Sequence, residues 1–248
     1  MKQILVLIIL CFSINIFSQG RNYMIDTIRI TSDILQENRI IIIHKPLNLS
    51  NNDSVQVVYC VDGESIGRFQ RLINERFHDS IPNLIMVGIL HTDRRRDLLY
   101  VKGADKFLDF VTTELISAVE KDYKIKNRIL YGHSFGGAFT VYSMIHKPSY
   151  FNFFIASSPT PIMGLIKKEY YQQIDSSSKT VFYFSYGSKD MRQVRKWSNR
   201  LKDNLTGLKF NNFEWRFEIF EGKNHNNSDI YAIISGLNNF RTPYMAQI

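Results

Sequence analysis

Short runs of apolar, β-branched or aromatic residues recur along the chain and predict a series of strands. They occupy residues 25–30, 40–44, 55–61, 84–90, 129–131, 151–156, 181–186 and 213–220. Several runs are apolar at consecutive positions, as at residues 40–43 and 84–87. Consecutive apolar positions are typical of strands that are covered on both faces, as they are in a parallel sheet.

Stretches of helical length lie between these runs. Helices are predicted over residues 65–77, 107–119, 137–146, 194–205 and 229–240. In the second of them, Phe107, Phe110, Val111 and Leu115 recur at intervals of three and four, so one side is apolar and Glu114 is expected to face water. From residue 55 onward strands and helices alternate, which predicts an α/β fold with a mostly parallel central sheet and helices on both faces. The first two runs lie close together and predict an antiparallel hairpin at one edge of the sheet.

The first 18 residues have the pattern of a signal peptide. Lys2 supplies a positive start, residues 4–14 form an apolar run, and Ser18 is a small residue at the expected cleavage point. The run is shorter than the roughly 20 apolar residues of a membrane span, although an uncleaved anchor is the alternative. The sequence therefore predicts a periplasmic or secreted protein without stable membrane insertion after cleavage. Residues 19–248 are expected to form one domain, because no Pro- or Gly-rich linker divides them.

Composition and charge narrow the classes of partner. Hydrophobic residues make up 44% of the 248 residues and charged residues 22%, values close to the average for a soluble globular protein. The formal net charge is +8, but the Lys and Arg residues are scattered and form no long basic run among aromatics. A nucleic-acid partner is therefore not predicted. Signal-peptide cleavage would leave Cys60 as the one cysteine, which is expected to be a buried, inert thiol.

The segment 128–137 carries the motif with the clearest chemistry. It contains Gly-x-Ser-x-Gly, formed by Gly132, Ser134 and Gly136, between a predicted strand and a predicted helix. A sharp reversal from strand to helix strains the serine backbone and leaves no room for side chains two positions away on either side. Ser134 would then stand at a helix N-terminus, where the helix dipole favours developing negative charge. The sequence predicts a nucleophilic serine, and the alternative is a strand-to-helix turn without chemistry.

A serine hydroxyl needs a general base, and the predicted base is His225. This histidine lies in a polar turn after the last predicted strand and before the last predicted helix. Enzymes with this type of turn at the nucleophile carry the serine, an acid and the histidine in that chain order. His133 directly precedes the serine, but its side chain is expected to point away and to be structural.

The acid should follow a strand between the serine and the histidine. Asp190 does so, after the run at 181–186, and would hold the imidazole tautomer. Glu221 and Asp229 are alternatives, and so is a Ser-His dyad without an acid. Asp190 could instead act as a helix N-cap.

Two backbone donors are predicted to stabilise a developing oxyanion. One is the N–H of Phe135, after the nucleophile. The other is the N–H of Gly63, with Glu64 as the second choice, because a glycine there permits close approach to the substrate. An ordinary Asp-Gly turn is the alternative interpretation of that site.

Three consecutive arginines follow the fourth predicted strand. Arg94, Arg95 and Arg96 lie where loops surround the ligand crevice of an open α/β sheet, so they are candidates for binding an anionic substrate oxygen. A solvated loop paired with Asp93 and Asp97 is the alternative. The sequence has no metal-ligand motif, phosphate-binding loop or dinucleotide fingerprint, and no cofactor is predicted.

Together these segments resemble the esterase group that includes the enterochelin-type siderophore esterases and esterase D. The segments that carry the resemblance are 59–63, 93–97, 132–137, 156–159 and 187–190, with Asn224 and His225. The resemblance implies an α/β-hydrolase fold, ester hydrolysis and no cofactor. The chain departs from the group's pattern at the acid, because some members carry Glu or work with a dyad.

The expected function is that of an exported serine esterase. Its substrates would be siderophore-type or carbohydrate-linked acyl esters, and the pocket rather than the fold decides between them. The alternatives are an inactive binding protein on a hydrolase scaffold and an acyltransferase on the same scaffold.

Overall fold

The computed structural model describes residues 23–50, 53–77, 80–81, 83–172, 174 and 179–245. The predicted signal peptide lies outside these residues. No helix within the described part of the chain is long and apolar enough to cross a lipid bilayer.

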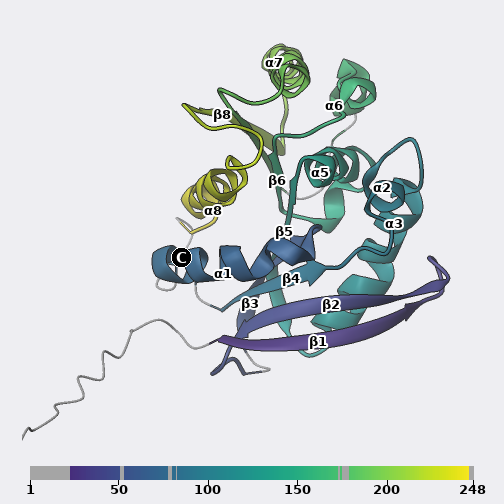
Figure 1. Ribbon diagram of the computed structural model, residues 1–248. Coiled ribbons are helices and arrows are strands. Elements are labelled where there is room, and N and C mark those ends of the chain that lie inside the picture. Colours follow the sequence, from purple (N-terminus) through teal and green to yellow (C-terminus); the bar gives the residue numbers. More distant parts are fainter. Residues whose placement is uncertain are drawn as a thin grey trace, which may run out of the picture.

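Eight strands form one mixed sheet in the order β1-β2-β4-β3-β5-β6-β7-β8 (Figure 1). The strands are β1 (Tyr23–Ser32), β2 (Glu37–Pro46), β3 (Ser54–Cys60), β4 (Leu84–Ile89), β5 (Lys124–His133), β6 (Phe153–Ser157), β7 (Thr180–Gly187) and β8 (Phe213–Phe220). The pairs β1–β2 and β2–β4 are antiparallel, and the remaining pairs are parallel. The predicted α/β fold, with its N-terminal hairpin at one edge, is therefore confirmed.

Helices cover both faces of the sheet. The longer ones are α1 (Ile66–Phe77), α5 (Phe135–His146), α7 (Arg192–Thr206) and α8 (Asp229–Met245). A segment made of α3 (Ala104–Phe110), one π-helical turn (Val111–Leu115) and α4 (Ile116–Glu120) fills the predicted range 107–119. Shorter elements are α2 (Arg94–Leu98), α6 (Lys168–Gln172) and the 3₁₀ turns Gly63–Ser65, Pro148–Tyr150 and Met163–Leu165.

Alternation along the strands builds a separate core on each face. In β3, Val57 and Tyr59 pack into the core that includes α3, α5 and α7, while Val58 and Cys60 pack into the core of α1 and α8. Figure 1 shows α1 and α8 together on one side of the sheet. Because both faces are covered, the central strands are apolar at consecutive positions. Cys60 is fully buried and free, and burial raises the pKa of its thiol.

Two acidic residues of the segment 104–120 do not simply face water. Glu114 Oε1 accepts hydrogen bonds from the backbone N–H groups of Asp33 (2.9 Å) and Ile34 (3.2 Å), in the turn between β1 and β2. Glu120 accepts two bonds of 2.7 Å from the guanidinium of Arg128. Glu114 is half-buried rather than fully solvated, because its carboxylate satisfies backbone donors of the hairpin turn.

Candidate active site

The turn between β5 and α5 has the geometry that the sequence predicts. Ser134 has φ 58° and ψ −115°, a strained conformation for a residue other than glycine. A Cβ atom on Gly132 would lie 2.1 Å from the carbonyl oxygen of Gly136. A Cβ atom on Gly136 would lie 2.7 Å from Oδ2 of Asp62. Gly132 is therefore required for the chain to reverse here, and Gly136 lets the loop after β3 lie directly against the turn.

Ser134, His225 and Asp190 come together from three separate loops. His225 Nε2 lies 2.9 Å from Ser134 Oγ, and His225 Nδ1 lies 2.9 Å from Asp190 Oδ1. A carboxylate only accepts hydrogen bonds, so Nδ1 carries the proton and Nε2 is left to accept the proton of the serine hydroxyl. The imidazole is 20% exposed, whereas the Asp190 side chain is fully buried. The arrangement suits proton removal from Ser134.

The turn that carries His225 is held against the end of β7. Lys189 N–H donates to the carbonyl of Lys223 at 2.8 Å. Gly187 approaches the same carbonyl so closely that a Cβ atom would lie 2.2 Å from its oxygen. The glycine at the end of β7 therefore lets the histidine turn reach Asp190.

Two serines that the sequence analysis did not identify complete the surroundings of Asp190. Ser158 Oγ donates to Asp190 Oδ2 at 2.5 Å and lies 2.9 Å from Ser228 Oγ. The backbone N–H of Met191 donates to Oδ1 at 2.7 Å. Burial opposes ionisation of Asp190, but the hydrogen bonds from His225, Ser158 and Met191 lower the pKa of its carboxyl below the usual value. The signal for Ser158 in the sequence was the Ser-Pro pair after β6.

The contacts of Asp190, Glu221 and Asp229 do not match the alternatives to Asp190 as the acid. Met191, not Asp190, stands at the N-cap of α7. Glu221 accepts a hydrogen bond from Ser188 Oγ at 3.1 Å, and Asp229 forms an ion pair with Arg68. Asp190 is thus the carboxylate that contacts His225.

Gly63, the candidate for the second oxyanion donor, is buried at the start of a 3₁₀ turn. A Cβ atom there would lie 2.8 Å from backbone atoms of both Gly88 and Ile89 in β4. Packing against β4 therefore requires glycine at this position, whatever its N–H contacts. Phe135, the other candidate donor, is the first residue of α5, and the exposed Glu64 follows Gly63.

The three arginines do not form one binding surface, because residues 94–98 are a helix rather than a loop. Asp93 caps α2 by accepting from the N–H groups of Arg95 and Arg96, both at 3.0 Å. Arg94 forms an ion pair with Asp62 and donates to the carbonyl of His133 at 3.3 Å.

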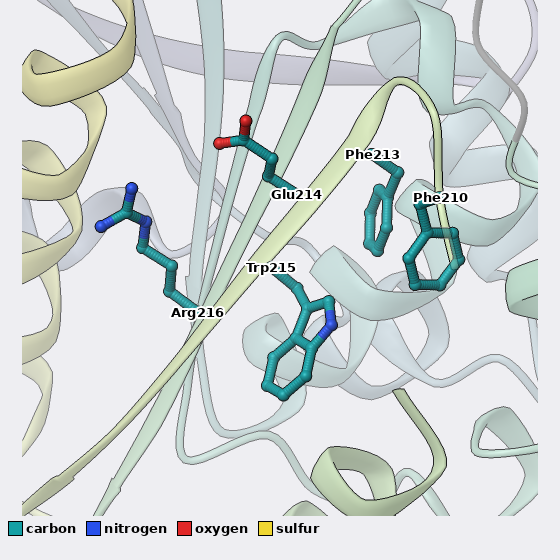
Figure 2. Close-up of a pocket in the computed structure, with 5 residues that line it drawn as sticks. All are labelled: Phe210, Phe213, Glu214, Trp215 and Arg216. Atoms are coloured by element: carbon teal, nitrogen blue, oxygen red, sulfur yellow. The ribbon is translucent and has the colours of Figure 1, made fainter. Parts of the chain in front are cut away.

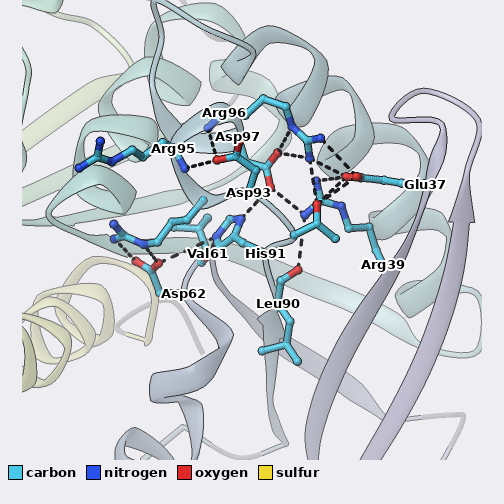
Figure 3. A network of polar contacts seen from close by, with 12 residues as sticks. Glu37, Arg39, Val61, Asp62, Leu90, His91, Asp93, Arg95, Arg96 and Asp97 are labelled. Carbon is cyan, nitrogen blue, oxygen red and sulfur yellow. Dashed lines mark hydrogen bonds and ion pairs between the residues drawn. The ribbon is translucent and has the colours of Figure 1, made fainter.

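The side chains of Arg95 and Arg96 also have different surroundings. Arg96 binds Glu37 and Asp97, whereas the side chain of Arg95 is exposed (Figure 3). Consecutive residues of a helix point in directions about 100° apart, which explains why the three side chains separate.

His133, expected to point away from the serine and to be structural, lies beside the candidate base. Its ring centroid is 4.8 Å from that of His225, and its Nδ1 lies 3.0 Å from Ser157 Oγ. Burial, together with the nearby His225, lowers the pKa of His133 to about 4. The ring is therefore neutral at neutral pH and adds no positive charge next to the base.

A cavity of about 240 Å³ opens beside His133. Its lining residues are Asp62, Glu64, Ser65, Phe69, Arg94, Tyr131, His133 and Asp229. A second hollow, of about 480 Å³, lies at the beginning of β8 among Phe210, Phe213, Glu214, Trp215 and Arg216 (Figure 2). The histidine turn follows the other end of β8, so the second hollow is remote from Ser134. Among the described residues, no three His, Cys, Asp or Glu side chains cluster as metal ligands.

The sheet order and the serine turn define an α/β-hydrolase-like protein. Residues 32–226 match the family model described as "Putative esterase", and the chain belongs to this family. The predicted resemblance to the esterase group is thereby confirmed.

Curated relatives match over shorter segments. The ferri-bacillibactin esterase BesA of Bacillus subtilis is 38% identical over 60 residues, which cover 23% of this chain and 21% of that protein. The siderophore enterobactin esterase of Emericella nidulans is 33% identical over 106 residues, which cover 38% of this chain and 34% of that protein. The matches thus span about a fifth to a third of these relatives' own lengths.

Solved structures share the fold over most of the chain. The BES protein from Bacillus cereus has a TM-score of 0.76 at 21% identity, covering 86% of this chain and 93% of that one. The siderophore hydrolase EstA from Aspergillus nidulans has a TM-score of 0.72 at 21% identity, covering 94% and 98%. At this level of identity the likeness supports the fold.

Proposed function

We propose that this protein is a serine esterase that works through an acyl-enzyme, with Ser134 as nucleophile, His225 as general base and Asp190 as the acid that orients it. The observation that carries the proposal is the 2.9 Å separation of His225 Nε2 from Ser134 Oγ. It lies within the hydrogen-bond reach that a general base needs. Membership of the esterase family supports the same reaction class.

The first half of the proposed reaction forms the acyl-enzyme. His225 Nε2 takes the hydroxyl proton as Ser134 Oγ forms a bond to the ester carbonyl carbon. The carbonyl oxygen becomes an oxyanion and receives hydrogen bonds from the N–H groups of Phe135 and Gly63. The carbon–oxygen bond of the leaving alcohol then breaks, and His225 returns its proton to that alcohol. Asp190 stabilises the imidazolium between the two proton transfers.

Water repeats the sequence in the second half. His225 removes a proton from water as the water oxygen attacks the acyl carbon. The bond to Ser134 Oγ breaks, and the proton on His225 restores the serine hydroxyl, which releases a carboxylic acid.

The proposed substrates are siderophore-type esters, because relatives named as siderophore esterases match in sequence. The cavity beside His133, about 240 Å³, is smaller than the roughly 300–1,000 Å³ that hold a drug-sized ligand. One arm of a large ester would enter it while the rest stays outside. Carbohydrate-linked acyl esters remain the second candidate, since a feruloyl group is also a single aromatic arm.

A hydrolysis panel tests the proposed function. The purified protein should cleave an enterobactin-like trilactone faster than feruloyl or acetyl-sugar esters, with the carboxylic acid and alcohol products identified by mass spectrometry. Faster cleavage of the sugar esters would assign the carbohydrate substrates. Labelling by a fluorophosphonate without any hydrolysis would favour the acyltransferase, tested by transfer to an added alcohol. If the protein is neither labelled nor hydrolytically active, the remaining interpretation is a binding protein on this scaffold.

We also propose that the protein is exported. The support is the positive start, apolar run and small residue within residues 1–18. Full-length protein expressed with its own N-terminus should appear in the periplasm or medium, with an intact mass that lacks these 18 residues. A membrane-bound protein of full mass would indicate an anchor instead.

A further inference from the structure

A buried polar network links the N-terminal hairpin to the loop that precedes α1 (Figure 3). Arg39 on β2 is fully buried and pairs with Asp97 of α2 at 2.7 Å and with Glu37 at 2.5 Å. Asp97, 1% exposed, also lies 2.9 Å from Nδ1 of His91, which is itself 3% exposed. Charges buried this deeply need well-placed partners, and the carboxylates of Glu37 and Asp97 supply them for Arg39.

The network ends on the backbone of the loop formed by residues 61–63, which we call the oxyanion loop. His91 Nε2 contacts the carbonyl oxygen of Val61, while the N–H of Val61 donates to the carbonyl of Tyr131 at 3.1 Å. The guanidinium of Arg94 holds the carboxylate of Asp62, with Nη2 to Oδ2 at 3.0 Å. Gly63 then packs against β4. Each residue of the oxyanion loop is therefore held in place by its own contact.

Asp97 is suited to orient His91. Burial opposes ionisation, but hydrogen bonds from His91, Arg39 and Arg96 hold the pKa of this carboxyl well below its usual range. The carboxylate therefore accepts from the Nδ1–H of His91. The carbonyl of Val61 can also only accept, so its hydrogen bond comes from the Nε2–H, and the ring donates at both nitrogens.

We infer that His91 and Arg94 are positioning residues that set the Gly63 N–H for oxyanion stabilisation. This inference rests on the proposed function, because it assigns a role within the same site. His91 holds the peptide group before Asp62. Arg94 pairs with Asp62 and also contacts the serine turn, because its guanidinium donates to the carbonyl of His133 and lies 5.2 Å from the ring centroid of Phe135. Arg94 thereby ties the oxyanion loop to the serine turn. Oxyanion donors act through fixed placement, and a misplacement of about 1 Å costs on the order of 10²-fold in rate.

A pair of substitutions at His91 separates positioning from general stability. An asparagine amide reaches about as far as Nδ1 and a glutamine amide about as far as Nε2. In full-length protein, His91→Asn should keep the Asp97 contact, lose the Val61 contact and lower kcat for p-nitrophenyl acetate by about 10²-fold, with KM changed less than about threefold. His91→Gln should restore kcat to within about fivefold of wild type.

A boronic acid that forms a tetrahedral adduct with the serine provides a second readout. Its affinity should fall in His91→Asn by a factor similar to that in kcat, because both depend on the oxyanion donors. The control is Arg128→Gln, which breaks the paired hydrogen bonds to Glu120 outside the network and should lower Tm without lowering kcat.

Several outcomes would overturn the inference. Wild-type kcat in His91→Asn, equal losses in His91→Asn and His91→Gln, or a matching kcat loss in Arg128→Gln would each do so. If His91→Asn fails to fold, Arg94→Gln is used instead, because the Arg94 side chain is 38% exposed. This variant should lower kcat about tenfold, and an unchanged kcat would contradict the inference. If the wild-type protein shows neither hydrolysis nor serine labelling, the result would contradict the proposed function itself.

Discussion

Replacing Ser134 by alanine is expected to lower kcat for p-nitrophenyl acetate by about 10⁶-fold, the scale found for nucleophile removal in serine proteases. The reason is that, within the described residues, Ser134 supplies the hydroxyl that contacts His225 Nε2. Ser134 Oγ lies 2.9 Å from His225 Nε2, whereas Ser157 contacts His133 and Ser158 contacts Asp190. The residual rate should come from substrate binding and the oxyanion donors alone.

Steady-state kinetics and fluorophosphonate labelling measure this effect together. The matched control is Ser188→Ala, because Ser188 Oγ hydrogen-bonds Glu221 and Gly222 and contacts none of Ser134, His225 and Asp190. The control should keep wild-type turnover and full labelling, while Ser134→Ala should lose both. Turnover of Ser134→Ala near the wild-type rate would remove Ser134 from the mechanism.

Replacing Asp190 by asparagine is expected to lower kcat by on the order of 10⁴-fold. Asp190 accepts from Nδ1 of His225, from Ser158 Oγ and from the N–H of Met191, so its carboxylate is committed to accepting. An asparagine amide placed there can donate to Nδ1 and so favour the tautomer whose proton is on Nε2. That tautomer faces Ser134 with a donor and no longer accepts the hydroxyl proton.

The kcat of Asp190→Asn should be compared with those of Glu221→Gln and Asp229→Asn. Neither carboxylate contacts His225, because Glu221 accepts from Ser188 and Asp229 pairs with Arg68, so each variant should stay within a few-fold of wild type. KM should change little in Asp190→Asn, since the carboxylate is buried behind the histidine. A few-fold loss in Asp190→Asn would indicate a Ser-His dyad, and a large loss in Glu221→Gln would move the acid to that residue.

The order of strands and helices followed from the local pattern. Runs such as 84–87, apolar at consecutive positions, predict strands covered on both faces, and β4 has all six residues buried. The serine turn could also be predicted from the sequence, because Gly132 is required by its contact with Gly136, four residues later. Gly136 makes room for Asp62 and Val61, and these contacts are set by the tertiary structure. His225 and Asp190 could be named because each follows a strand of a parallel sheet, and the carboxyl ends of such strands meet at one edge.

Contacts between distant segments were decided by the tertiary structure. The sequence indicated one basic loop at residues 94–96, but these residues lie in a helix that turns their side chains toward different neighbours. Glu114 sits at a polar position of its helix, yet the hairpin turn that supplies its donors lies about 80 residues earlier in the chain.

The sequence by itself determined the fold class, the strained serine and the candidate base and acid, since local periodicity and steric limits specify them. The tertiary structure alone decided which partners surround them: Ser158 behind Asp190, His133 beside His225, and His91 against the oxyanion loop. These contacts depend on side-chain direction and on the relative placement of separate loops. Both quantities are set by packing across the whole sheet rather than by neighbouring residues.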